Sequence, residues 1–202
     1  LDKLDTAWSD VSLDDAQDSL HNVEKAKTKL EAAKKTLQAD GVQFPIHLDL
    51  PVSSTQTDFV RQAQSYKQSI EEALGAENVV VDIQQVSDDE LGSMTVLATS
   101  KDNIDWDINP NSGWSPDYAD PSTYLDAFDP TSGPTLLGAL GIAPGSDSSA
   151  IKAVGLDKYK ELLDDANSEK TDLEKRYSKY AKAQAWLTDS ALVIPVHSDG
   201  AQ

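Results

Sequence analysis

Hydrophobic and polar residues alternate with two different periods along the chain, and each change of period marks a predicted helix or strand. Apolar residues spaced by three, four and seven predict an amphipathic helix over residues 12–41. Alternation by two then predicts a strand over 44–50. A second helix is predicted over 55–75, and the β-branched run 79–83 predicts a second strand.

The same two patterns continue through the middle of the chain. Ser87 opens a capping box, which predicts a short helix, and the alternation over 104–108 predicts a third strand. Strand, helix, strand, helix and strand within about 65 residues favour parallel strands joined by right-handed crossovers. The fold class is therefore predicted as α/β, with a mostly parallel sheet flanked by helices.

The last third is predicted to be mostly helical. Short helices are expected near 123–128 and 135–140, and longer ones over 156–166 and after Thr171. The apolar run Ala191–Val196 has the composition expected of a strand buried on both faces.

Charge excludes several classes of partner. The chain has 17 Lys and Arg against 35 Asp and Glu, a formal net charge of −18. No basic stripe exists for phosphates, so nucleic acid and anionic membrane surfaces are not expected partners. No apolar run approaches the roughly 20 residues of a membrane span, so this segment is not expected to insert into a membrane. Absence of cysteine excludes disulfides and thiolate chemistry.

No enzyme or metal signature is present. The three histidines are far apart, which leaves a zinc site unsupported. Asp105, Asp107 and Asn109 imitate the start of a calcium loop. Pro110 and Pro116 then occupy the positions that need Gly and Glu, so the match fails. We expect no catalytic residue, no metal and no cofactor.

The segment after the predicted third strand has the composition of a binding loop. Open α/β sheets bind ligands beyond the carboxyl ends of their strands. Gly113 permits close backbone approach, Trp114 offers an apolar wall, and Asp117 lies between a proline and a tyrosine, which predicts a poorly solvated carboxylate. A tight loop whose Asp caps a helix and whose Trp fills the core is the alternative, and the residues leave both open. Asp120 is interpreted as a helix N-cap, with Pro121 in the first turn.

The run from Trp106 to Asp126, with its Trp-x-x-Asp-Tyr-x-Asp-Pro core, resembles the ligand loop of oligopeptide-binding proteins. These are the extracytoplasmic receptors of peptide ABC importers, and the sequence of this run is most similar to that of streptococcal-type lipoproteins. Segments 44–51, 78–83 and 176–195 agree in the same order, so the resemblance covers roughly residues 12–198.

The resemblance implies a domain organisation. Family members close two α/β lobes over an extended peptide, and this chain resembles the second lobe only. We therefore expect an irregular lead-in over 1–11, a lobe of type II periplasmic-binding-protein-like fold over 12–198, and a crossover toward a first lobe over 199–202. A signal peptide and a lipid-attachment cysteine would lie upstream, with the receptor anchored at the extracellular face of the membrane.

The resemblance also implies roles for particular residues. Asp117 occupies the position that pairs with the α-ammonium of the peptide. Gly113, Trp114 and Ser115 occupy the segment whose backbone hydrogen-bonds the peptide, with Trp114 forming the wall of a side-chain pocket. Asn111 completes the ligand-binding set. Some relatives carry an Arg there, so a carboxylate-pairing role is not carried over.

These implications identify a non-catalytic lobe of a receptor that delivers oligopeptides to an ABC permease. Two alternatives stay open. The first is a receptor of the same superfamily for nickel, heme or an oligosaccharide. Asp117 favours an amine-bearing ligand, and the scarcity of histidine disfavours nickel. The second is a surface adhesin or scaffold that is built on the long N-terminal helix and has no ligand site.

Overall fold

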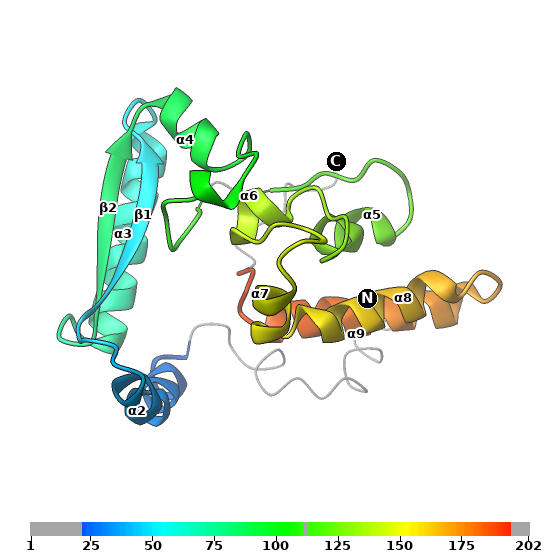
Figure 1. Ribbon diagram of the computed structural model, residues 1–202, viewed down its shortest axis with the longest axis horizontal. Coiled ribbons are helices and arrows are strands. Elements are labelled where there is room, and N and C mark those ends of the chain that lie inside the picture. Colours follow the sequence, from blue (N-terminus) through cyan, green and yellow to red (C-terminus); the bar gives the residue numbers. More distant parts are fainter. Residues whose placement is uncertain (1–21, 111–112, 195–202) are drawn as a thin grey trace. The chain divides into compact units, whose positions relative to one another are not determined.

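The computed structural model describes residues 22–110 and 113–194, which form α/β structure in two compact units (Figure 1). Among the described residues, the sheet unit comprises 22–110, 113 and 137–141, and the helical unit comprises 114–136 and 142–194. The chain therefore passes from one unit to the other between Gly113 and Trp114. The predicted lead-in, the start of the predicted first helix, Asn111 and the last eight residues lie outside the described residues.

The sheet unit is built on one β-α-β crossover. Strands β1 (Ile46–Ser53) and β2 (Val79–Val86) pair in parallel, with Ile46 opposite Val79. The connecting helix α3 (Thr57–Leu74) runs along both strands, as Figure 1 shows. Leu50, Val52, Ala63 and Val81 are fully buried between the helix and the strands. The predicted α/β class and parallel pairing are confirmed.

Local capping explains where the helices of this unit begin and end. The helices are α2 (Val23–Ala39), α3, α4 (Asp88–Met94) and the 3-10 turn η1 (Lys101–Asn103). The Ser87 hydroxyl accepts the backbone N–H of Glu90 at 3.2 Å, so the predicted capping helix is confirmed. Gly75 ends α3 with a φ of 85°, which is unfavourable for residues with a side chain.

The predicted third strand is wrong. Residues 104–108 touch the free edge of β1 only at Asp49, whose carbonyl accepts the N–H groups of Asp107 and Ile108 at 2.9 and 3.0 Å. The N–H of Asp49 bonds the Asp107 carboxylate at 2.8 Å, where a strand would offer a carbonyl. This side-chain acceptor interrupts the ladder, although Ile108 still packs against the core as its apolar spacing predicts.

The helical unit consists of short helices followed by a long hairpin of two helices. They are α5 (Ser122–Leu125), the 3-10 turn η2 (Asp126–Phe128), α6 (Leu136–Leu140, continuing into the sheet unit), α7 (Ser148–Ala153), α8 (Leu156–Ser168) and α9 (Leu173–Asp189). Helices α8 and α9 lie side by side (Figure 1) and bury Tyr159, Leu163, Tyr180 and Ala183. The Tyr159 hydroxyl also donates to the carbonyl of Leu125 at 2.7 Å, which ties α5 to α8.

The predicted final strand is wrong over the four residues of it that the structure describes. Ala191 has a φ of 56° and donates its N–H to the Thr188 carbonyl at 3.3 Å, so α9 ends in a turn. Ile194 is 73% exposed. An apolar run forms a buried strand only beside partner strands, and the sheet of the described residues has only β1 and β2.

Candidate functional site

Trp114 is anchored at its nitrogen and exposed along part of its ring. Its Nε1 donates a hydrogen bond to the backbone carbonyl of Thr123 at 2.7 Å. The residue is 38% exposed, so the alternative in which Trp114 fills the core is wrong. A fixed and partly exposed indole is suited to packing against an apolar group of a ligand.

Asp117 combines a fixed backbone with an open carboxylate. Its N–H donates to the Thr123 hydroxyl at 2.9 Å. The residue is exposed, and within the described part of the chain its carboxylate forms no hydrogen bond or ion pair. The predicted poorly solvated setting is therefore wrong for this chain. The helix-capping alternative is wrong as well, because the carboxylate of Asp120, three residues later, performs that role.

Thr123 holds the loop at two points and was not singled out by the sequence pattern. Its carbonyl accepts from Trp114 and its hydroxyl from Asp117, while the residue itself is only 4% exposed. The Tyr118 hydroxyl lies 3.1 Å from the Ser122 hydroxyl and adds a third link between the loop and α5. Two side chains of the loop, Trp114 and Tyr118, and the backbone N–H of Asp117 thus hold residues 114–118 to the start of α5.

Asp120 bonds the start of α5 and also forms an ion pair that its sequence position does not reveal. Its Oδ1 accepts the N–H of Ser122, the first residue of α5, at 3.0 Å, from one residue before the N-cap position, which Pro121 occupies. Arg176 donates from Nε to Oδ2 at 3.1 Å and from Nη2 to Oδ1 at 2.9 Å. These bonds hold the pKa of Asp120 far below its ordinary value, chiefly through Arg176 and against the opposing effect of burial. The predicted role of Asp120 as a cap alone is therefore incomplete.

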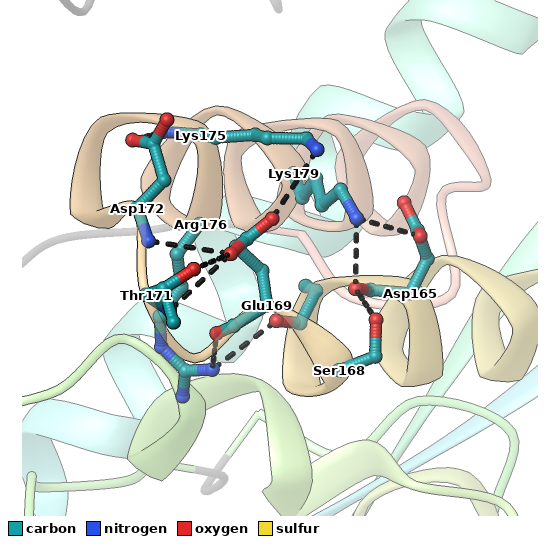
Figure 2. A network of polar contacts seen from close by, with 9 residues as sticks. Asp165, Ser168, Glu169, Thr171, Asp172, Lys175, Arg176 and Lys179 are labelled. Atoms are coloured by element: carbon teal, nitrogen blue, oxygen red, sulfur yellow. Dashed lines mark hydrogen bonds and ion pairs between the residues drawn. The ribbon is translucent and has the colours of Figure 1, made fainter.

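Arg176 joins three segments of the helical unit through one guanidinium group. Besides Asp120, it donates from Nη1 to the carbonyls of Ala166 and Glu169, at 3.1 and 2.9 Å (Figure 2). Its guanidinium carbon lies 4.8 Å from the centre of the Tyr180 ring. The bonds to Asp120 raise the pKa of Arg176, so the group stays charged.

The turn between α8 and α9 is ordered by the Glu169 carboxylate. Oε1 accepts the N–H groups of Thr171 and Asp172 at 3.3 and 3.2 Å, and Lys175 lies 3.3 Å from Oε2 (Figure 2). These bonds, led by the one from Asp172, lower the pKa of Glu169 to about 2. Arg176 therefore lies in the first turns of α9, directly after a turn that is itself held by several polar contacts.

The remaining predicted site residues are exposed or lie outside the described chain. Gly113 and Ser115 are exposed, and an added Cβ at Gly113 would meet open space. Asn111 lies outside the described residues. The structure thus brings Trp114 and Asp117 together on Thr123, and it shows no packing reason for glycine at position 113.

Neither a cluster of metal ligands nor a membrane-spanning helix is found in the part of the chain that the structure describes. Across residues 22–110 and 113–194, no group of three or more His, Asp or Glu side chains is arranged to hold a metal ion. None of the helices in these ranges is both long and apolar enough for a membrane span. His47 pairs with Asp82 across the two strands at 2.6 Å and is exposed.

The chain is similar in sequence to three streptococcal proteins. Oligopeptide-binding protein AliA of Streptococcus pneumoniae is 54% identical over 191 residues, and oligopeptide-binding protein SarA of Streptococcus gordonii is 55% identical over 191. Oligopeptide-binding protein AmiA of S. pneumoniae is 50% identical over 188 residues. The alignments cover 93–95% of this chain and 28–29% of the relatives. The chain therefore spans less than a third of the length of these proteins.

Solved structures of two peptide receptors share the fold. Listeria monocytogenes OppA bound to peptide has a TM-score of 0.55 at 22% identity, covering 85% of this chain and 27% of that one. The pheromone receptor PrgZ has a TM-score of 0.57 at 22% identity, covering 84% and 27%.

A sequence model of a protein family matches most of the chain. Residues 4–135, well over half of its length, match the model described as bacterial extracellular solute-binding proteins, family 5 Middle. Members of this family are solute receptors. The chain belongs to the family 5 bacterial extracellular solute-binding proteins.

Proposed function

We propose that this chain is the peptide-binding second lobe, over residues 12–198, of a lipid-anchored oligopeptide receptor that delivers extracellular peptides to an ABC permease. The observation that carries the proposal is the loop at Trp114 and Asp117. It presents an exposed indole and an unpaired carboxylate on a backbone that is already pinned. The names of relatives that are 50–55% identical supply the class of ligand. A receptor of this kind binds and releases its ligand without catalysis.

Asp117 reads the peptide terminus. A free α-ammonium is common to all unmodified peptides, and its hydrogen bonds to a carboxylate are charge-assisted and therefore strong. An ordered backbone at Asp117 reduces the conformational entropy that the loop loses on binding. The carboxylate thus recognises a peptide without recognising its sequence.

The neighbouring residues read the peptide main chain and one side chain. Backbone groups of Gly113, Trp114 and Ser115 bond the peptide as an added strand does, which is equally independent of sequence. Trp114 forms the wall of a side-chain pocket, and Asn111 adds a neutral polar contact. Such a site binds peptides as a class, and its affinity for each peptide depends on how well one side chain fits the pocket.

The test is a double-mutant cycle in the complete receptor, with Asp117→Asn as one change and N-acetylation of the peptide as the other. In the complete receptor, where closed lobes bury the pair, Asp117→Asn should weaken binding by about 3–5 kcal/mol, because it leaves the peptide's ammonium buried without its partner. N-acetylation removes the same interaction from the other side and should also weaken binding strongly. Together they should be far from additive, with a coupling of at least about 1 kcal/mol. Titration calorimetry measures all four affinities.

Two controls make the cycle decisive. Glu161→Gln removes an exposed charge from α8 of the same unit and should leave affinity unchanged. A bulkier acyl cap should cost no more than acetyl, which separates charge loss from a steric clash. Additive energies, or unchanged affinity in Asp117→Asn, would show that the ammonium assignment is wrong. Native mass spectrometry of receptor purified from cells should independently detect copurified peptide.

A further inference from the structure

Thr123 makes two of the three side-chain links that hold the loop of residues 114–118 to α5, and Thr123 depends in turn on the start of α5. The loop contacts Thr123 through the Trp114 indole and the Asp117 N–H. The N–H of Thr123 donates to the Asp120 carbonyl at 3.1 Å, and the Asp120 carboxylate accepts from Ser122. Helix α5 itself has only four residues, Ser122–Leu125, so it is too short to be stable on its own. Its first turn therefore needs support from elsewhere in the fold.

Arg176, which lies 56 positions after Asp120 in the chain, supplies that support. The side chain of Arg176 is 12% exposed and that of Asp120 is 27% exposed, so solvent screens the pair less than a surface pair. Two parallel N–H bonds to one carboxylate fix direction as well as distance. The other side of the guanidinium is held by the carbonyls of Ala166 and Glu169, at the end of the well-packed helix α8 (Figure 2).

We infer that Arg176 is a positioning residue for peptide recognition: its fork to Asp120 fixes the start of α5 and, through Thr123, the indole of Trp114 and the backbone of Asp117. The inference rests on the proposed function for its ligand. It assigns a role in selecting free peptide termini to a residue that does not touch the peptide. Lysine could not replace Arg176, because one ammonium nitrogen cannot reach both carboxylate oxygens and both carbonyls in this geometry.

The neighbouring Lys179 provides a matched control. It also projects from α9 and pairs with a carboxylate, that of Asp165, at 2.7 Å, and it also donates to a carbonyl of α8 (Figure 2). It makes no contact with the loop or with Asp120 among its described hydrogen bonds. Lys179→Gln therefore removes a similar ion pair between the same two helices and leaves the loop in place.

The first experiment measures loop order in the chain labelled with fluorotryptophan. The fluorine NMR resonance of Trp114 is assigned with Trp114→Phe and then followed in Arg176→Gln, Asp120→Asn and Lys179→Gln. Asp120→Asn is the sharper variant, because Asn keeps an acceptor for Ser122 and leaves the Arg176 bonds to α8 intact. Arg176→Gln and Asp120→Asn should both move the resonance toward that of the free amino acid, and Lys179→Gln should not.

The second experiment measures selectivity in the complete receptor. The ratio of the dissociation constants for N-acetylated and free peptide should fall at least about fivefold in Asp120→Asn, and stay unchanged in Lys179→Gln. A variant that only lowered stability would leave this ratio as it is. An unmoved Trp114 resonance in folded Asp120→Asn, or an equal shift in Lys179→Gln, would overturn the positioning role.

The two experiments also distinguish this inference from the proposed function. If the wild-type receptor shows no preference for free over acetylated peptide, the role proposed for Asp117 fails, while the fluorine signal still decides whether Arg176 orders the loop. If Arg176→Gln does not fold, Asp120→Asn alone decides the question.

Discussion

Thr123 uses both of its oxygen atoms to hold residues that precede it by nine and six positions. Its carbonyl accepts a hydrogen bond from an indole, and its hydroxyl accepts one from a backbone N–H. The side chain thus provides an acceptor that a backbone carbonyl would otherwise provide. A threonine at a helix start ordinarily serves the helix that it begins. Here its oxygen atoms bond the segment that precedes the helix. A substitution at Thr123 can therefore change the order of the loop while the sequence of the loop stays the same.

Replacing Thr123 with valine should therefore destabilise the chain by about 1 kcal/mol, the usual contribution of one hydrogen bond, since valine keeps the shape and loses the acceptor. Thr123→Ser keeps the hydroxyl and should cost less. Urea unfolding with an unchanged denaturant slope measures both. Equal losses for valine and serine would mean that packing of the methyl group, and not the bond to Asp117, sets the cost.

A substitution at Gly113 can test ligand contact without disturbing the folded chain. An added Cβ meets nothing within 4 Å, so Gly113→Ala should leave thermal stability unchanged or raise it slightly by restricting the unfolded chain. In the complete receptor the same methyl group should weaken peptide binding, because the proposed site has the peptide backbone approaching closely at this point. Calorimetry and thermal melting measure the two effects.

Gly133 is the control with the opposite expectation. A Cβ there would lie 2.5 Å from the Ala127 carbonyl and 2.6 Å from the Asp129 nitrogen, so Gly133→Ala should destabilise the chain. Full affinity in Gly113→Ala would contradict close approach of a ligand at position 113.

Part of the candidate site could be proposed from residue types that lie close together in the sequence. Gly113, Trp114 and Asp117 are adjacent in sequence, and their residue types indicate backbone approach, an apolar wall and a charge. Thr123 and Arg176 act only through the fold. The bond between Arg176 and Asp120 spans 56 positions, and no short-range pattern indicates which of 35 carboxylates an arginine will meet.

Among the elements, the hairpin of α8 and α9 is the scaffold of the helical unit, and its turn is ordered by the charge of Glu169. Glu169 satisfies the first N–H groups before α9, which otherwise lack partners inside the helix. Because the carboxylate form makes these bonds, protonation weakens the turn that presents Arg176.

Glu169 should make stability depend on acid pH. Its pKa is about 2 in the folded chain against an ordinary 4.5, so its contribution is complete above about 4.5 and is lost as pH falls toward 2. Other carboxylates titrate in the same range, so the measured quantity is the difference in free energy of unfolding between wild type and Glu169→Gln. That difference should be largest near neutral pH and should shrink as pH falls through this window. A difference independent of pH would contradict the role of the charge.

Prediction of the elements succeeded where the determinants are local. Ser87 and Gly75 mark helix ends through bonds to residues within a few positions, and both were recognised from the sequence. Strands need partners, and alternation reports only that one face is apolar. Residues 104–108 keep their apolar face on the core, yet the Asp107 carboxylate occupies the N–H of Asp49 that a ladder would use.

At the scale of the whole molecule, the candidate site is open in this chain. Residues 113–119 are all exposed, so a peptide lying on them would stay in contact with water. Binding sites for small ligands ordinarily bury most of the ligand surface. In the proposed receptor, enclosure of a peptide would therefore fall to parts beyond the 28–29% that this chain spans in its relatives.

The chain alone should bind peptides weakly. An exposed charge pair contributes only about 0–1 kcal/mol, and half of a cleft cannot exclude solvent. Calorimetry with a mixed peptide pool should detect no tight site. A dissociation constant near or below about 1 μM, roughly −8 kcal/mol, would show instead that the site is complete within these residues.

The span of 56 residues between Asp120 and Arg176 also sets an order of events during synthesis. The loop motif is complete once residue 126 has left the ribosome, but the side chain that fixes it is made some 50 residues later. A nascent or truncated chain ending before Arg176 would therefore carry every residue of the motif and lack the geometry that makes the motif a binding surface. By the role inferred for Arg176, the loop gains its order only once α9 has formed.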